Sequence, residues 1–184
     1  MTFEDAHASL AYINGWLSEP EARLLWDAAR LTDGPMLEVG AYYGRSTILL
    51  ARLTGTAGKL RQVCSVDPFG GFDDRDPTGD FIHRSLLLNL DNRSIANVEV
   101  FRMRIEEWEP RPCGFAYLDG DHSHDGTLNQ IKVARQCNPQ AIAAHDVNDA
   151  GEGLAIKRAC LELLGMWDQR VERLREASTN QREP

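Results

Sequence analysis

The segment MLEVGAYYGRS, residues 36–46, decides the fold that is predicted for this chain. Residues 36–39 form a short strand-like run, and Gly40 directly after it permits a tight turn. Gly44 follows within the turn, and a helix of isoleucine, leucine and alanine is expected from Ser46 to Leu53. A strand, a glycine turn and a helix in this order are typical of the first unit of a Rossmann-like sheet.

Strand-like apolar runs and helical patterns alternate along the rest of the chain. Further strands are expected at residues 63–66, 98–101, 115–118, 141–144 and 170–174, with helices at 80–90, 127–136 and 154–164. Upstream, residues 3–13 are a helical candidate, and the capping box Ser18-Glu19-Pro20-Glu21 starts a second helix. This alternation predicts an α/β fold: a Rossmann-like, doubly wound, mainly parallel sheet with helices on both faces.

The length of 184 residues fits one domain. We expect an N-terminal helical segment packed on the core at 1–34, a Rossmann-like domain at 35–175, and a polar tail at 176–184. Because only a short polar stretch follows residues 170–174, the sheet is expected to be shortened at its C-terminal hairpin. We hypothesise that the N-terminal segment or a second copy in a homodimer covers the edge left exposed.

Composition excludes several classes of partner and site. The formal net charge of −8 disfavours nucleic acid as a partner, because such a surface repels phosphates. No apolar run is long enough to cross a membrane, and Met1 to His7 lacks the pattern of a signal peptide, so a cytoplasmic location is expected. The four cysteines are scattered without a C-x-x-C pair, so neither a zinc site nor a disulfide is expected.

Charged residues and glycines lie at the carboxyl ends of four of the predicted strands. They are Glu38 and Gly40, then Asp67, then Asp119, and finally His145 with Asp146. Because the carboxyl ends of parallel strands share one edge, these residues are expected to line one crevice. Asp67 lies about twenty residues past the glycines, the spacing at which an acid reaches a ribose hydroxyl pair. A loop-initiating aspartate before Pro68 explains Asp67 equally well.

Four motifs carry a resemblance to a known family. They are EVGAYYGRST at 38–47, VDPF at 66–69, YLDGDHS at 117–123 and AHD at 144–146. Together they resemble the class I S-adenosylmethionine-dependent methyltransferases, and most narrowly the branch of macrocin-type sugar O-methyltransferases and related antibiotic-tailoring enzymes. The resemblance covers about residues 15–159, and its most specific motif is DGDHS.

The resemblance implies a role for each matching position. S-adenosylmethionine would be bound by residues of the turn and of the strand ends: Glu38, Gly40, Ala41, Tyr42, Gly44, Ser46, Asp67, Pro68, Arg104, Ile105 and Asp119. Asp119 and Asp146 would bind a divalent metal, and two carboxylates suit Mg²⁺. His122 would be the catalytic base beside Asp119. The expected acceptor is a small-molecule hydroxyl of the sugar or natural-product type.

Other functions fit parts of the pattern. Asp119-x-Asp121 also resembles the acid pair of metal-dependent nucleotide-sugar transferases, and a catalytically degenerate cofactor-binding domain would keep the same turn. A nicotinamide dehydrogenase would need G-x-G-x-x-G, which Gly40-x-x-x-Gly44 does not supply. A histidine phosphohydrolase is disfavoured because its site usually lies in a helical fold. Residues 119–121 can also form a solvated turn, and His145 can be a buried histidine that orients Asp146.

Overall fold

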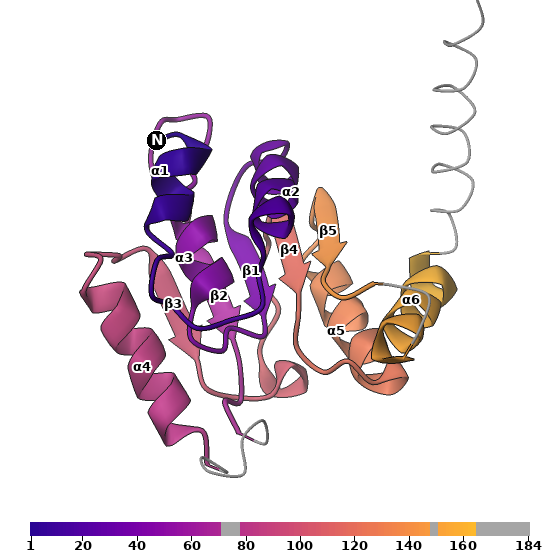
Figure 1. Cartoon of the computed structure of the whole chain (residues 1–184). Helices are drawn as coiled ribbons and strands as arrows, with labels where there is room; N and C mark the ends of the chain where they lie inside the picture. The colour runs from indigo at the N-terminus through magenta and orange to yellow at the C-terminus, as the bar shows by residue number, and fades with distance from the viewer. Residues whose placement is uncertain (71–77, 148–150, 165–184) are drawn as a thin grey trace, which may run out of the picture.

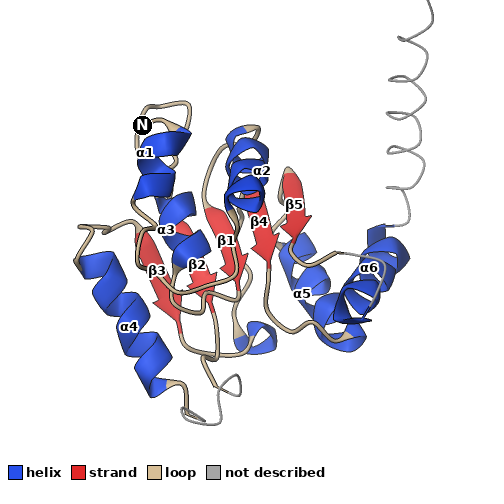
Figure 2. Cartoon of the chain, viewed as in Figure 1, coloured by secondary structure: helices blue, strands red, loops and turns tan. Residues whose placement is uncertain are grey.

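The computed structural model describes residues 1–70, 78–147 and 151–164. Five short strands alternate with helices (Figure 2). The strands are β1 (Met36–Val39), β2 (Val63–Val66), β3 (Val98–Phe101), β4 (Phe115–Leu118) and β5 (Ala141–Ala144). The helices are α1 (Phe3–Ala8), α2 (Glu19–Arg30), α3 (Arg45–Ala51), α4 (Asp80–Asp91), the 3₁₀ turn η1 (Ile105–Glu107), α5 (His124–Gln136) and α6 (Gly151–Leu164).

The strands form one parallel sheet in the order β3-β2-β1-β4-β5 (Figure 1). The chain moves outward from β1 to β3, then returns to the other side of β1 for β4 and β5. The reversal places the topological switch point between β1 and β4. In doubly wound sheets a ligand binds in the crevice beyond the carboxyl ends of the strands at this point.

Two apolar layers cover the two faces of the sheet. On one face, α1 to α4 bury side chains such as Trp26, Leu49 and Leu86 with Met36 and Phe115 of the sheet. The opposite face carries η1, α5 and α6 over alternate residues of the same strands: Leu37, Val39, Ala116 and Leu118. Every residue of β1 and β4 is buried, as expected of central parallel strands covered on both sides.

The predicted alternation and the parallel sheet with helices on both faces are confirmed. The helix expected at 127–136 begins earlier, at His124, because Ser123 accepts a hydrogen bond from the Gly126 amide and caps it. The helix expected over 3–13 ends at Ala8. The strand expected at 170–174 and the tail at 176–184 lie outside the described residues, as does the hypothesis about the sheet edge.

Arginine side chains tie the segment before β1 to the core, and one of them, the half-buried Arg45, lies beside the glycine turn. Arg45, the first residue of α3, donates hydrogen bonds to the backbone carbonyls of Leu10, Ile13 and Leu17. These bonds fix residues 10–17 beside the glycine turn.

Within the described segments, no helix combines the length and apolarity needed to cross a bilayer.

Candidate active site

Four residues lie in one row at the carboxyl edge of the sheet. Val39 is paired with Val66 and with Leu118, and Leu118 with Ala144. The next residues of these strands are Gly40, Asp67, Asp119 and His145. Backbone bonds extend the ladder by one step, from Gly40 to the Val66 carbonyl (3.0 Å), from Asp119 to Val39 (2.8 Å) and from His145 to Leu118 (2.9 Å). The strand ends therefore converge as the sequence predicts.

A cleft opens over this row. It comprises two adjoining cavities of about 330 Å³ and about 770 Å³, and both are lined by Trp16, Gly40, Asp67, Gly120 and His122. Volumes of this size are usual for small-molecule and cofactor sites. Most of the predicted site residues line one cavity or both: Gly40, Ala41, Tyr42, Ser46, Asp67, Pro68, Arg104, Ile105, Asp119, His122 and Asp146. Glu38 and Gly44 line neither, so their contact with a cofactor stays a prediction.

Gly40 lets the backbones of β1 and β4 meet without a side chain between them. Its φ is +88°, a conformation that L-residues with side chains rarely adopt. A Cβ here would lie 2.0 Å from the carbonyl oxygen of Asp119 and 2.8 Å from the amide nitrogen of Gly120. The glycine therefore allows the floor of the cleft to form.

Asp67 holds the glycine turn from the end of β2. Its Oδ2 accepts hydrogen bonds from the amides of Ala41 (2.7 Å) and Tyr42 (2.9 Å), and its Oδ1 accepts one from Phe69 (2.5 Å). The side chain is buried, although the residue still borders both cavities. The structure thus gives Asp67 a scaffolding task that the sequence did not reveal. Both lone pairs of Oδ2 are used by these amides, whereas Oδ1 keeps one further lone pair for a ribose hydroxyl.

Glu38 lies beneath the turn and faces the core. Thr47 and Ser65 donate hydroxyl hydrogen bonds of 2.6 Å to its Oε2, whereas Oε1 is buried without a hydrogen-bond partner among the described residues. Burial raises the pKa of this carboxyl to about 7, although the hydroxyl groups of Ser46, Ser65 and Thr47 stabilise the carboxylate and act to lower its pKa. Because Glu38 is fully buried, it supports the turn from behind.

We expect Glu38→Gln to change how stability depends on pH. Since the folded-state pKa of about 7 lies above the reference value of 4.5, the folded state holds a proton that the unfolded state has lost. Stability therefore falls as pH rises from about 4.5 to about 7. Glutamine does not titrate, so the variant lacks this loss. Its free energy of unfolding relative to wild type should therefore rise by on the order of 2 kcal/mol between pH 5 and pH 8. Denaturant unfolding at each pH measures it, and a constant difference across the range would contradict it.

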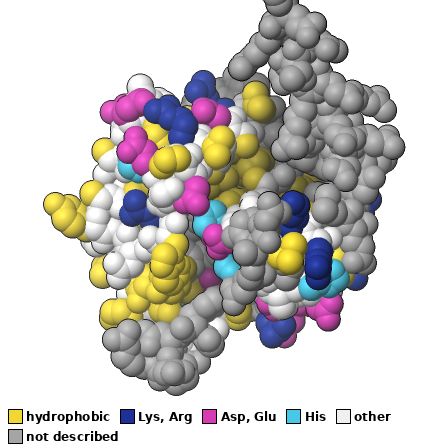
Figure 3. Space-filling view, turned by 45° about the vertical axis from the view of Figure 1, so that its right-hand side comes forward, with side chains coloured by type: hydrophobic (Ala, Val, Ile, Leu, Met, Phe, Trp, Pro, Cys, Tyr) yellow, Lys and Arg dark blue, Asp and Glu magenta, His cyan; other side chains and the backbone are white. Residues whose placement is uncertain are grey.

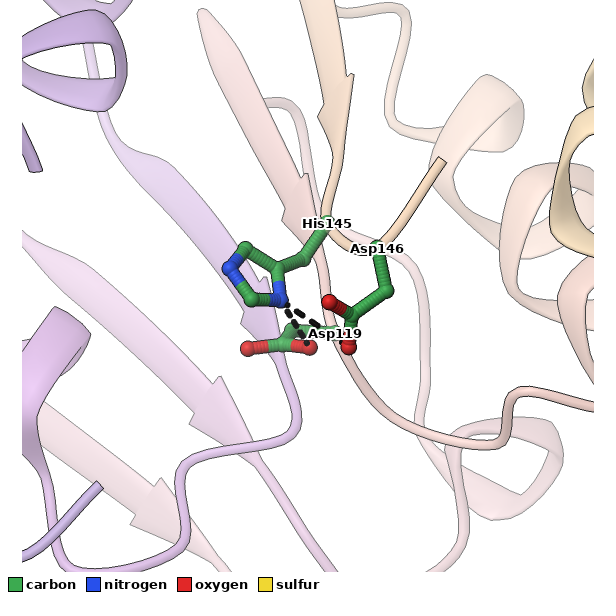
Figure 4. A group of neighbouring side chains, drawn as sticks. All are labelled: Asp119, His145 and Asp146. Carbon is green, nitrogen blue, oxygen red and sulfur yellow. Dashed lines mark ion pairs between the residues drawn. The ribbon is translucent and has the colours of Figure 1, made fainter. Parts of the chain in front are cut away.

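Three side chains at the ends of β4 and β5 could hold a metal ion. Ligand atoms of Asp119, His145 and Asp146 all lie within 4.8 Å of one another. In Figure 4 the Nδ1 atom of His145 points at the two carboxylates, and it lies 3.3 Å from Asp119 Oδ1 and 3.2 Å from Asp146 Oδ2. The Asp119 carboxylate, despite the opposing effect of burial, raises the pKa of His145 to about 9. Two carboxylates and one imidazole thus meet at a single point, as the ligands of a cation would.

His122 and Tyr117 complete the surroundings of Asp119. His122 Nε2 lies 3.5 Å from Asp119 Oδ1 and 3.8 Å from Asp146 Oδ2, and Tyr117 donates a hydrogen bond of 3.2 Å to Asp119 Oδ2. Burial disfavours ionisation of Asp119, but His122 and His145 outweigh it and lower its pKa. Figure 3 shows acidic and histidine side chains side by side near the middle of one face, with hydrophobic side chains around them.

The N-terminal segment contributes two residues to the site. Trp16 lines both cavities and stacks on Tyr42, with ring centroids 5.0 Å apart. Glu21, expected only to cap α2, also places its Oε1 atom 3.5 Å from His145 Nε2. His145 was recognised at a strand end but not as a metal ligand. Its position directly before Asp146, at the end of a parallel strand, was the available signal.

Comparisons with known proteins agree with this geometry. A family described as a methyltransferase domain matches residues 37–147. CalS11, a calicheamicin methyltransferase, superposes with a TM-score of 0.60 at 19% identity, over 82% of this chain and 74% of its own. A Bacillus cereus O-methyltransferase in complex with SAH superposes with a TM-score of 0.57 at 18% identity, over 89% and 76%. No curated protein matches significantly.

At such identities the superpositions show the fold, whereas the family match spans more than half of the chain and shows its membership. Together with the glycine turn at the end of β1 and the cleft over the strand ends, this settles the class. The chain belongs to the methyltransferase-domain family and is a class I S-adenosylmethionine-dependent methyltransferase.

Proposed function

We propose that this enzyme methylates a hydroxyl oxygen of a small molecule, of the sugar or natural-product type, with the help of a divalent cation. The observation that carries the proposal is the meeting of four polar side chains, Asp119, His122, His145 and Asp146, at the floor of the cleft. A hydroxyl needs both positioning and proton removal to act as a nucleophile near neutral pH. This group of carboxylates and imidazoles offers both.

S-adenosylmethionine, when bound, would supply a methyl group on a positively charged sulfur. The sulfur would be the leaving group as the acceptor oxygen takes the methyl group in line, and S-adenosylhomocysteine would be the product. The residues expected to hold it are those of the turn and its neighbours, with Gly40 allowing close approach and Asp67 beside the ribose. Arg104 and Ile105 border the larger cavity, and they are the residues proposed to flank the adenine. The stacked rings of Trp16 and Tyr42 form one wall of the cleft.

His122 is the proposed base. It borders both cavities, its side chain is 30% exposed, and Asp119 beside it stabilises the imidazolium that forms when the acceptor hydroxyl gives up its proton. A divalent cation, when bound, supplies a Lewis acid that lowers the pKa of the acceptor hydroxyl. Asp119 and Asp146 are the proposed ligands, and Mg²⁺ is the ion expected from the two carboxylates alone.

The choice of a sugar acceptor has support from a related structure. The apo form of CalS11, at 16% identity and a TM-score of 0.56, is described as a TDP-rhamnose 3′-O-methyltransferase. The alternative of a nucleotide-sugar transferase required Asp121 to act with Asp119. Asp121 instead accepts a hydrogen bond of 2.8 Å from the Ser123 amide, and it lies outside the candidate metal group.

The experiment is titration with S-adenosylhomocysteine, followed by transfer of a labelled methyl group to a panel of hydroxylated acceptors. We expect binding of S-adenosylhomocysteine but not of NAD or a nucleotide sugar alone. We expect His122→Asn to keep this binding and to lower the turnover number about 10²- to 10⁴-fold, the usual contribution of a general base. Full turnover in the variant excludes His122 as the base, and binding without transfer to any acceptor supports a degenerate domain.

A further inference from the structure

His145 is a buried imidazole whose ring nitrogens make no hydrogen bond within the described part of the chain. Its side chain is only 9% exposed, and neither Nδ1 nor Nε2 has a hydrogen-bond partner there. Both nitrogens lie 3.2–3.5 Å from carboxylate oxygens, in ion pairs with Asp119, Asp146 and Glu21 that lack hydrogen-bond geometry, whereas buried polar groups in native structures are usually hydrogen-bonded. The ring is aimed at the carboxylates of Asp119 and Asp146, as Figure 4 shows. An ion between the three groups would use the Nδ1 lone pair.

The opposite edge of the ring faces a second carboxylate. Glu21 Oε1 lies 3.5 Å from His145 Nε2, while Glu21 Oε2 is held by the Ser18 amide (2.8 Å) and hydroxyl (2.6 Å). The capping box at the start of α2 thus anchors a carboxylate beside His145. Histidines that bind metal through one nitrogen almost always offer the other N–H to such a group, which fixes the tautomer and the ring orientation.

The geometry points to His145 as a third metal ligand, bound through Nδ1 and positioned by Glu21, in a mixed nitrogen and oxygen site that selects a first-row transition ion over Mg²⁺. This inference rests on the proposed metal assistance and refines the identity of the ion. Imidazole suits the later first-row ions such as Fe²⁺, Co²⁺, Ni²⁺ and Zn²⁺, whereas Mg²⁺ prefers oxygen ligands. The two aspartates alone predict Mg²⁺. The additional imidazole ligand favours a first-row transition ion instead.

Calorimetric titration of the metal-free full chain with Co²⁺ and with Mg²⁺ tests the selection. We expect Co²⁺ to bind at least about 100-fold more tightly. His145→Asp restores an all-oxygen site and should lower this ratio at least about tenfold. Pulsed EPR of the Mn²⁺-loaded protein should show coupling to an imidazole nitrogen, and this coupling should be lost in His145→Asp but kept in His122→Asn.

Glu21→Gln tests the positioning role without touching the ligand set. Loss of such an outer carboxylate typically costs about 10- to 100-fold in metal affinity. Glu19→Gln is the matched control, since it removes one negative charge from the same turn of α2 and should leave Co²⁺ affinity unchanged. Thermal unfolding of each variant checks that the fold is intact.

Three results overturn the inference: equal affinity for Co²⁺ and Mg²⁺, nitrogen coupling that survives His145→Asp, or equal effects of Glu21→Gln and Glu19→Gln. Titration of the same samples with S-adenosylhomocysteine separates the two proposals. If S-adenosylhomocysteine binds and methyl transfer proceeds while the metal results fail, only the inference about His145 is wrong. If the metal results hold but no methyl transfer is found, the proposed function is wrong.

Discussion

Gly40→Ala should abolish binding of S-adenosylhomocysteine and lower the free energy of unfolding by about 3–5 kcal/mol, an exceptional effect for one methyl group. The new Cβ would lie 2.0 Å from the Asp119 carbonyl oxygen and 2.5 Å from its carbonyl carbon. Both are backbone atoms of the neighbouring strand end, so relief requires β1 and β4 to separate at the cleft. The measurements are denaturant unfolding and calorimetric titration with S-adenosylhomocysteine.

Gly58→Ala is the control for the backbone conformation. Gly58 also has a positive φ, +68°, but nothing lies within 4 Å of the position where its Cβ would be. Its substitution isolates the cost of the left-handed conformation, about 1 kcal/mol, and should leave cofactor binding unchanged. If the two alanine variants behave alike, the close approach of Gly40 to β4 is not what makes the glycine necessary.

Asp67→Asn should weaken the binding of S-adenosylhomocysteine about 10- to 100-fold and lower the free energy of unfolding by about 2–3 kcal/mol. The carboxylate accepts three backbone N–H groups, two on Oδ2 and one on Oδ1. An amide has only one oxygen, so at least one of the amides of Ala41, Tyr42 and Phe69 would face an N–H₂ group. Unfolding and binding titrations measure the two effects separately.

A double-mutant cycle separates the scaffolding task of Asp67 from a contact with ribose. S-adenosylhomocysteine and its 2′-deoxy analogue are titrated against wild type and Asp67→Asn. If Asp67 accepts a ribose hydroxyl, loss of the hydroxyl weakens binding to wild type much more than binding to the variant. Equal losses in both proteins restrict Asp67 to holding the turn.

The strand positions and their order could be predicted because each strand is a short apolar run bounded by polar residues, glycine or proline. The row of functional residues followed from the same pattern, since parallel strands bring their carboxyl ends to one edge. Gly40, Asp67, Asp119 and Asp146 needed nothing more than this rule and the resemblance to be selected. The start of α5 was missed by three residues because Ser123, rather than a later residue, caps it.

Contacts between distant segments could not be predicted. Glu21 meets His145, and Arg45 binds the carbonyls of residues 10–17, only because α2 and the segment before it fold over the edge of the sheet. The sequence likewise could not show that Glu38 faces the core, since a strand residue followed by a turn can point to either face. Periodicity describes local structure, whereas these contacts depend on how the layers pack.

By itself, the sequence determined the doubly wound fold and the edge at which chemistry takes place, because the succession of strands and helices along the chain and the ends of the strands are written in local patterns. Only the tertiary structure decided what each polar side chain does at that edge. Asp67 holds the turn, Glu38 supports it from the core, and His145 joins the two aspartates. Hydrogen bonding and metal ligation act over about 2–4 Å, so side-chain roles are set by packing between segments rather than by spacing along the chain.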